Sequence, residues 1–161
     1  VWDPQAVRIM TEAGVGSEVT LDLGGKTDMP AVGARAAPLR LTGRVRTLSD
    51  GRWIVRGPMY TGVEVNTGPS AVFEVGSMRI VVVSRHHEPW DTGIFTSLGI
   101  DPRHCRYLLL KSRIHYRAGF APLATATIPL DGVGVTTSDN SLLHFENVRR
   151  PIYPLDWNAA L

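Results

Sequence analysis

A lysine, a serine, a histidine and an arginine lie close together in the second half of the chain. They are Lys111, Ser112, His115 and Arg117, and they follow an apolar run at 107–110. Their ammonium, imidazole and guanidinium groups can bind a polar substrate, and a neutral imidazole can act as a base or ligate a metal. The apolar run predicts a strand and the residues after it a short helix. Junctions of this kind bind ligands in open α/β sheets.

Ser112 is predicted to cap this helix, with its side-chain oxygen accepting a hydrogen bond from the backbone N–H of Ile114 or His115. His115 would then lie in the first turn, where the positive end of the helix dipole favours a neutral imidazole. The alternative is a capped helix whose charged side chains simply lie at the surface. The spacing alone leaves both interpretations open.

A second polar group, made of His86, His87 and Glu88, follows the β-branched run at 80–83. These residues could ligate a metal or form a solvated loop, but no HExxH or CxxC spacing accompanies them. Neighbouring side chains at a strand end point in opposite directions, so at most one histidine should face a given site. Arg85 and Asp91 are predicted to form a structural pair or a ligand clamp, because a guanidinium binds carboxylates with a rigid fork.

Lysine is rare in this chain. Only two of the 17 cations are lysines, Lys26 and Lys111, and both lie at the ends of predicted strands. An ammonium is a compact charge that a guanidinium does not replace, so both positions indicate a specific use of lysine. Lys26 follows two glycines but lacks the spacing of a phosphate-binding P-loop.

The composition is that of an ordinary globular domain. The chain has 161 residues, of which 43% are hydrophobic and 20% charged, and we expect one domain over residues 1–161. The net charge is +2, and no basic run alternates with aromatic residues, which argues against a nucleic-acid partner. No apolar stretch approaches the roughly 20 residues that span a bilayer, which argues against a membrane partner.

The N-terminal sequence predicts the location and the context of the chain. It lacks the pattern of a signal peptide, and the lone Cys105 excludes an intrachain disulfide, so we expect a cytoplasmic protein. The chain starts at Val1 without an initiator methionine, from which we expect it to belong to a longer protein.

Hydrophobic patterning predicts the elements that position these residues. A helix is expected over 4–13, with Asp3 at its N-cap and Pro4 in its first turn. Alternation predicts a strand over 17–23, and residues 24–38 form a long loop.

Two hairpins are predicted in the middle of the chain. The first joins 39–48 to 52–56 and presents several arginines to solvent, and the second joins 71–75 to 78–84. Segments 106–111 and 124–130 flank the short helix and could form one β-α-β unit. The predicted fold class is α+β, with mostly antiparallel hairpins and a few short helices.

Several motifs of the chain, taken in order, resemble the C-terminal domain of the microcystinase C family, the microcystin-degradation metallopeptidases. The most specific pieces are Lys-Ser-x-x-His-Tyr-Arg-Ala-Gly-Phe at 111–120 and Arg-Arg-Pro-Ile-Tyr-Pro-Leu-Asp at 149–156. They are accompanied by Leu-Gly-Gly-Lys at 23–26, Gly-Pro-Met at 57–59 and Leu-Gly-Ile-Asp-Pro at 98–102. The resemblance covers nearly the whole chain.

The resemblance implies a domain of a zinc-dependent metallopeptidase or amidohydrolase that acts on peptide-like substrates. Most of the zinc ligands are expected in an N-terminal domain that is absent from this sequence, so no metal ligand is assigned here. The isolated chain is expected to be inactive. Lys111, Ser112 and His115 are the expected catalytic residues. Lys26, Arg85 and Arg117 are the expected substrate-binding residues of a cleft shared with the N-terminal domain.

The alternative is a non-catalytic interaction or oligomerisation module. It is motivated by the lack of a complete catalytic set and by the arginine-rich face of the first hairpin, which includes Arg44 and Arg46. A homodimer is one assembly that the sequence leaves open.

Overall fold

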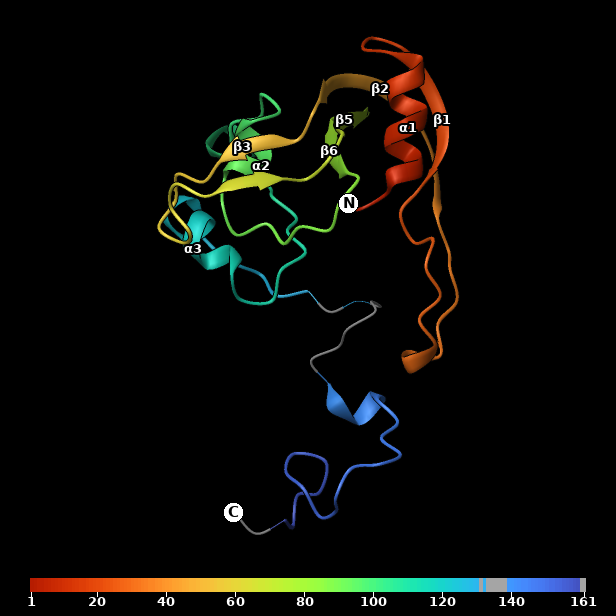
Figure 1. The fold of residues 1–161 in the computed structure, drawn as a ribbon, viewed down its shortest axis with the longest axis vertical. Helices are drawn as coiled ribbons and strands as arrows, with labels where there is room; N and C mark the ends of the chain where they lie inside the picture. The colour runs from red at the N-terminus through yellow and green to blue at the C-terminus, as the bar shows by residue number, and fades with distance from the viewer. Residues whose placement is uncertain (131, 133–138, 160–161) are drawn as a thin grey trace. The chain divides into compact units, whose positions relative to one another are not determined.

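The computed structural model describes residues 1–130, 132 and 139–159 (Figure 1). The chain divides into two compact units. The first is formed by Val1–Gly24 with Pro38–Ile128, and the second by Gly25–Ala37 with Pro129–Leu161. All of the predicted site residues except Lys26 belong to the first unit.

The first unit is built on a four-stranded antiparallel sheet with the order β1-β2-β5-β6. Its strands are β1 (Glu18–Leu23), β2 (Leu39–Ser49), β5 (Ser70–Val75) and β6 (Met78–Val83). The predicted strand at 17–23 and the predicted hairpin of 71–75 with 78–84 are therefore confirmed. The α+β class is confirmed as well, since short helices accompany antiparallel sheets.

One face of this sheet is covered by helix α1 (Pro4–Ala13), as Figure 1 shows. Asp3 caps the helix as predicted, because its Oδ1 accepts a hydrogen bond of 2.9 Å from the backbone N–H of Ala6. The apolar stripe of the helix packs against alternate residues of the strands. The buried residues of this cluster are Ala6, Val7, Met10, Leu21, Leu23, Val45, Ala71, Phe73 and Val82.

The opposite face packs against a second, two-stranded sheet and a short helix. These elements are β3 (Arg52–Ile54), β4 (Glu64–Asn66) and α2 (Gly93–Thr96). The strands β5 and β6 contribute to both faces because their side chains alternate. The buried residues here are Trp53, Val55, Val65, Val72, Val81, Val83, Ile94, Leu98, Ile100 and Phe120.

The prediction of a hairpin between 39–48 and 52–56 is wrong. The long strand β2 pairs with β1 and β5, whereas β3 pairs with β4. The register of β2 shifts between Val45 and Thr47, where a bulge bends the strand. Trp53 and Val55 then enter the core on the other face, so burial of these side chains outweighs the local turn signal.

The predicted β-α-β unit at 106–130 is not formed in the described structure. Its helix is present as α3 (Tyr116–Phe120), followed by the 3-10 helix η3 (Ala121–Leu123), and η2 (Pro102–His104) precedes the region. Neither 106–111 nor 124–130 pairs with a strand in the part of the chain that the structure describes. Leu108 and Leu110 nevertheless pack against the core around Trp53.

Among its described residues, the second unit contains two single-turn 3-10 helices, η1 (Pro30–Val32) and η4 (Asn140–Leu142). Its C-terminal part bends back on itself, because Nε of Arg150 donates to Oδ2 of Asp156 at 2.6 Å. This ion pair and the backbone N–H of Ile152 lower the pKa of Asp156 to about 2. None of the described helices is long and apolar enough to cross a bilayer.

Candidate active site

Glu88 joins Ser112 and His115 into one cluster. Its Oε1 accepts a hydrogen bond from the hydroxyl of Ser112, and its Oε2 lies 2.8 Å from Nδ1 of His115. The side chains of His115 and Glu88 are 45% and 35% exposed, so the pair lies at the surface. The structure thus brings together two of the three predicted catalytic residues around a carboxylate.

This contact fixes the orientation of the imidazole. A carboxylate can only accept hydrogen bonds, so Nδ1 of His115 must carry the proton in the contact with Glu88. In the neutral ring, Nε2 then holds the lone pair. A carboxylate that fixes a histidine in this way is found beside many catalytic and metal-binding imidazoles. His115 is therefore placed to take up or deliver a proton through Nε2.

The prediction that Ser112 caps Ile114 or His115 is wrong in detail. The helix begins at Tyr116, and its N-cap position is His115. The hydroxyl of Ser112 accepts a hydrogen bond of 3.1 Å from the backbone N–H of Tyr116 and at the same time donates to Glu88. Ser112 therefore links the carboxylate of Glu88 to the first turn of α3.

The electrostatics of the cluster favour an ionised carboxylate. Partial burial of Glu88 acts to raise its pKa, but the hydrogen bonds from Ser112 and His115 and the charge of His115 outweigh burial. The pKa of Glu88 consequently lies below its usual value. A carboxylate anion therefore faces His115 near neutral pH.

The segment that carries Glu88 is anchored by residues on both sides of it. His86 stacks on Trp2 with ring centroids 3.8 Å apart, whereas His87 packs against Trp90 at 4.3 Å. The two histidines thus point in different directions, as predicted. Asp91 is buried, and its carboxylate accepts hydrogen bonds of 2.7 Å from the backbone N–H groups of Gly57 and Gly93.

His87 lies in an aromatic environment without a partner for one ring nitrogen. Its ring meets Trp53 edge-on at 5.5 Å, and within the described residues its buried Nε2 has no hydrogen-bond partner. Burial lowers the pKa of His87, and the nearby charges of Glu88 and Asp91 only partly oppose this effect. His87 is therefore a packing residue of the segment that holds Glu88.

Sequence reasoning missed Glu88 as the partner of His115. It lies 27 positions before His115, and no local spacing relates the two. The fold brings them together because the chain after β6 and the start of α3 pack against the same core, which Trp90 and Tyr116 both contact. The only sequence signal was the presence of a carboxylate in a polar group that follows a buried strand.

Comparison with known proteins identifies the family. The family described as "MlrC C-terminus" matches residues 1–147. The chain belongs to this family.

Two relatives of this MlrC C-terminus domain indicate its context. Microcystinase C from Sphingomonas sp. is 25% identical over 156 residues, which are 97% of this chain and 28% of the relative. A crystal structure of a putative metallopeptidase from Mesorhizobium sp. BNC1 is 30% identical with a TM-score of 0.82. It matches 97% of this chain and 30% of the solved one. The MlrC C-terminus domain thus spans less than a third of both relatives.

The other predicted site residues of this MlrC C-terminus domain lie at exposed positions. Lys111 precedes Ser112, and Arg117 lies on α3 with its guanidinium 5.5 Å from the centre of the Tyr116 ring. Arg85 does not pair with Asp91 as predicted; its backbone N–H donates to Thr67, and its side chain lies beside Gly68. Lys26 belongs to the second unit, so its place in the site stays a prediction.

The described residues do not form a metal centre of their own. Within them, no three His, Cys, Asp or Glu side chains are close enough together to hold a metal ion. The donor set does not fit a complete zinc site, although His115 could supply one ligand.

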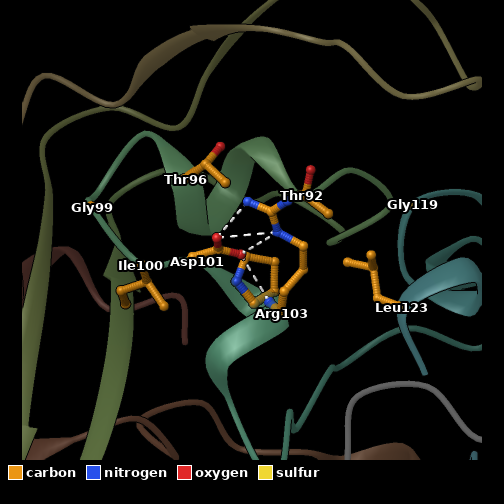
Figure 2. A pocket seen from close by; sticks show the side chains of 9 residues that line it. Thr92, Thr96, Gly99, Ile100, Asp101, Arg103, Gly119 and Leu123 are labelled. Atoms are coloured by element: carbon orange, nitrogen blue, oxygen red, sulfur yellow. Dashed lines mark hydrogen bonds and ion pairs between the residues drawn. The ribbon is translucent and has the colours of Figure 1, made fainter. Parts of the chain in front are cut away.

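A surface pocket of about 470 Å³ is lined by residues that are close in sequence to Glu88, Ser112 and His115, but by none of these three. Figure 2 shows Asp101 and Arg103 in it, together with Thr92, Thr96 and Leu123. Nη2 of Arg103 binds Oδ2 of Asp101 at 2.6 Å, so the charged groups of the pocket neutralise each other. This pairing lowers the pKa of Asp101 to about 2. The pocket therefore offers no uncompensated charge to a ligand.

Proposed function

We propose that this chain is the C-terminal domain of a zinc-dependent metallopeptidase or amidohydrolase that acts on peptide-like substrates. It would line a cleft shared with an N-terminal domain that supplies the zinc ligands. The observation that carries this proposal is the carboxylate-oriented His115, because its Nδ1 is held by Glu88 and its side chain is 45% exposed. The family match and the length of the relatives support the domain arrangement.

The roles of the residues follow from their chemistry. His115 exchanges a proton with the attacking water or the leaving amine through Nε2, while Glu88 stabilises the charged imidazole. The ammonium of Lys111 and the guanidinium of Arg117 bind carbonyl or carboxylate oxygens of the substrate. Zinc would polarise the scissile carbonyl and activate water, with ligands drawn mainly from outside the described residues.

The test is His115→Ala in the longer enzyme, with His104→Ala as the matched control because His104 is exposed beside Asp101. We expect His115→Ala to lower kcat/KM by at least about 100-fold, the scale of losing one proton-transfer group. His104→Ala should keep near-normal turnover. Normal turnover in a folded His115→Ala enzyme contradicts the proposal.

Zinc titration of the isolated chain and of its His115→Ala variant separates two roles of the histidine. Stoichiometric zinc that is lost in the variant would make His115 a metal ligand. No zinc in either would confine His115 to proton transfer or substrate binding. Both results are compatible with a cleft shared with the N-terminal domain. The kinetics of His115→Ala in the longer enzyme test that cleft.

The assembly alternative stays a hypothesis, although three arginines of the arginine-rich face have partners within the domain. Arg40 pairs with Asp22, Arg46 with Glu74 and Arg52 with Glu64, at 3.3, 3.2 and 2.7 Å. Carboxylates of neighbouring strands thus already balance these arginines.

A further inference from the structure

The segment at 106–113 leaves its backbone without hydrogen bonds inside the domain. Within the described residues, no backbone N–H or C=O of this segment bonds to another residue. From Tyr107 to Ser112 the side chains alternate between exposed and partly buried positions, which is the pattern of a strand. The segment therefore has the form of a strand that lacks a neighbour.

One face of this segment is already fixed to the domain. Leu108 and Leu110 pack against the core around Trp53, and Ser112 is held by Glu88. The other face presents Tyr107 and Leu109 to solvent, with 73% and 80% of their surface exposed. A strand that is anchored on one face, with unpaired backbone groups and exposed apolar side chains, can pair with an added strand.

We propose that residues 106–111 pair as a strand with an extended segment from the remaining part of the parent peptidase. This inference rests on the proposed function, since it requires that the chain belong to a longer enzyme. The share of the relatives that lies outside the matched region is large enough to supply such a strand, because this chain covers only 28% and 30% of them. The added strand would end beside Lys111, Ser112 and His115.

The charges define what the added strand must carry. Arg106, Lys111 and Arg113 are exposed, and none of them has a carboxylate partner among the described residues. A complementary strand places apolar side chains opposite Tyr107 and Leu109 and acidic residues near the cations.

A second copy of this chain fits less well, because residues 106–113 contain three cations and no carboxylate. Antiparallel self-pairing centred between Leu108 and Leu109 would set Arg106 opposite Lys111, and like charges in that position destabilise a pair of strands. Charge complementarity therefore favours a different, acidic segment.

Hydrogen exchange of the backbone amides of 106–111, followed by NMR, tests the proposal in the isolated chain and in the longer enzyme. We expect fast exchange in the isolated chain. In the longer enzyme, alternate amides should slow by at least about 100-fold, because every second N–H of an edge strand points to its neighbour. Leu109→Asp should abolish this slowing, whereas Leu39→Asp, at another exposed leucine, should leave it intact. Unchanged thermal unfolding of the isolated Leu109→Asp chain would confirm that the variant folds.

Three results would overturn the proposal. They are fast exchange in the longer enzyme, slowing in the isolated chain that grows with protein concentration, and slowing that appears only when a peptide substrate is added. The second would indicate a dimer and the third a substrate strand. If His115→Ala still lowers turnover while these amides exchange fast, the proposed function stands and the docking strand alone is rejected.

Discussion

Replacing Asp91 by alanine should destabilise the domain strongly, because this carboxylate is 2% exposed and holds two backbone groups. It accepts hydrogen bonds of 2.7 Å from the N–H groups of Gly57 and Gly93. Hydrogen bonds to a charged group contribute about 1.5–3 kcal/mol each. Gly57 is only half-buried, so water can replace part of its bond in the variant. We therefore expect a loss of about 3 kcal/mol in the free energy of unfolding.

The assay is chemical and thermal unfolding of the isolated chain, followed by circular dichroism. A loss of this size corresponds to a fall in Tm of about 6–12 °C for a chain of this length. The control is Asp22→Ala, which removes an exposed ion pair with Arg40 and should cost less than about 1 kcal/mol. If Asp91→Ala changes stability no more than Asp22→Ala does, then Asp91 does not anchor the segment that carries Glu88.

Two further predictions concern pH. Burial keeps the pKa of His87 in the folded state below the ordinary histidine value of about 6.5. The contribution of His87 to stability is therefore complete above about pH 6.5 and is lost as the pH falls through the folded pKa. His87→Phe should flatten the fall in unfolding free energy between about pH 7 and 5. The control His86→Phe alters only the exposed stacking on Trp2 and should leave this fall unchanged. Equal pH slopes in both variants and the unmodified chain would refute the assignment to His87. The pKa of Glu88 is lowered, so its contribution is present above the unfolded value of about 4.5 and is lost as the pH falls through the folded value. Glu88→Gln should therefore reduce the loss of stability below about pH 4.5, by less than about 1 kcal/mol because the carboxyl is partly exposed. The same variant should lower the turnover of the longer enzyme. If both acid unfolding and turnover are unchanged, Glu88 is not part of the site.

The sequence by itself determined the local elements. Asp3 and Pro4 mark the start of α1, alternation marks β1 and β2, and a hairpin pattern marks β5 and β6. Capping, periodicity and turn signals all depend on neighbours within a few residues. The group at 111–117 was likewise visible as a concentration of reactive side chains. The family resemblance drawn from these motifs is confirmed by the match to residues 1–147.

Only the tertiary structure decided how these pieces meet. The pairing of β3 with β4 instead of β2 follows from burial of Trp53 and Val55, which no local turn signal expresses. Glu88 reaches His115 because two segments far apart in sequence pack on one core, and a hydrogen bond between them leaves no periodic trace in the chain. Local interactions set what each segment can form, whereas long-range burial sets which segments become neighbours, and the candidate site depends on the second.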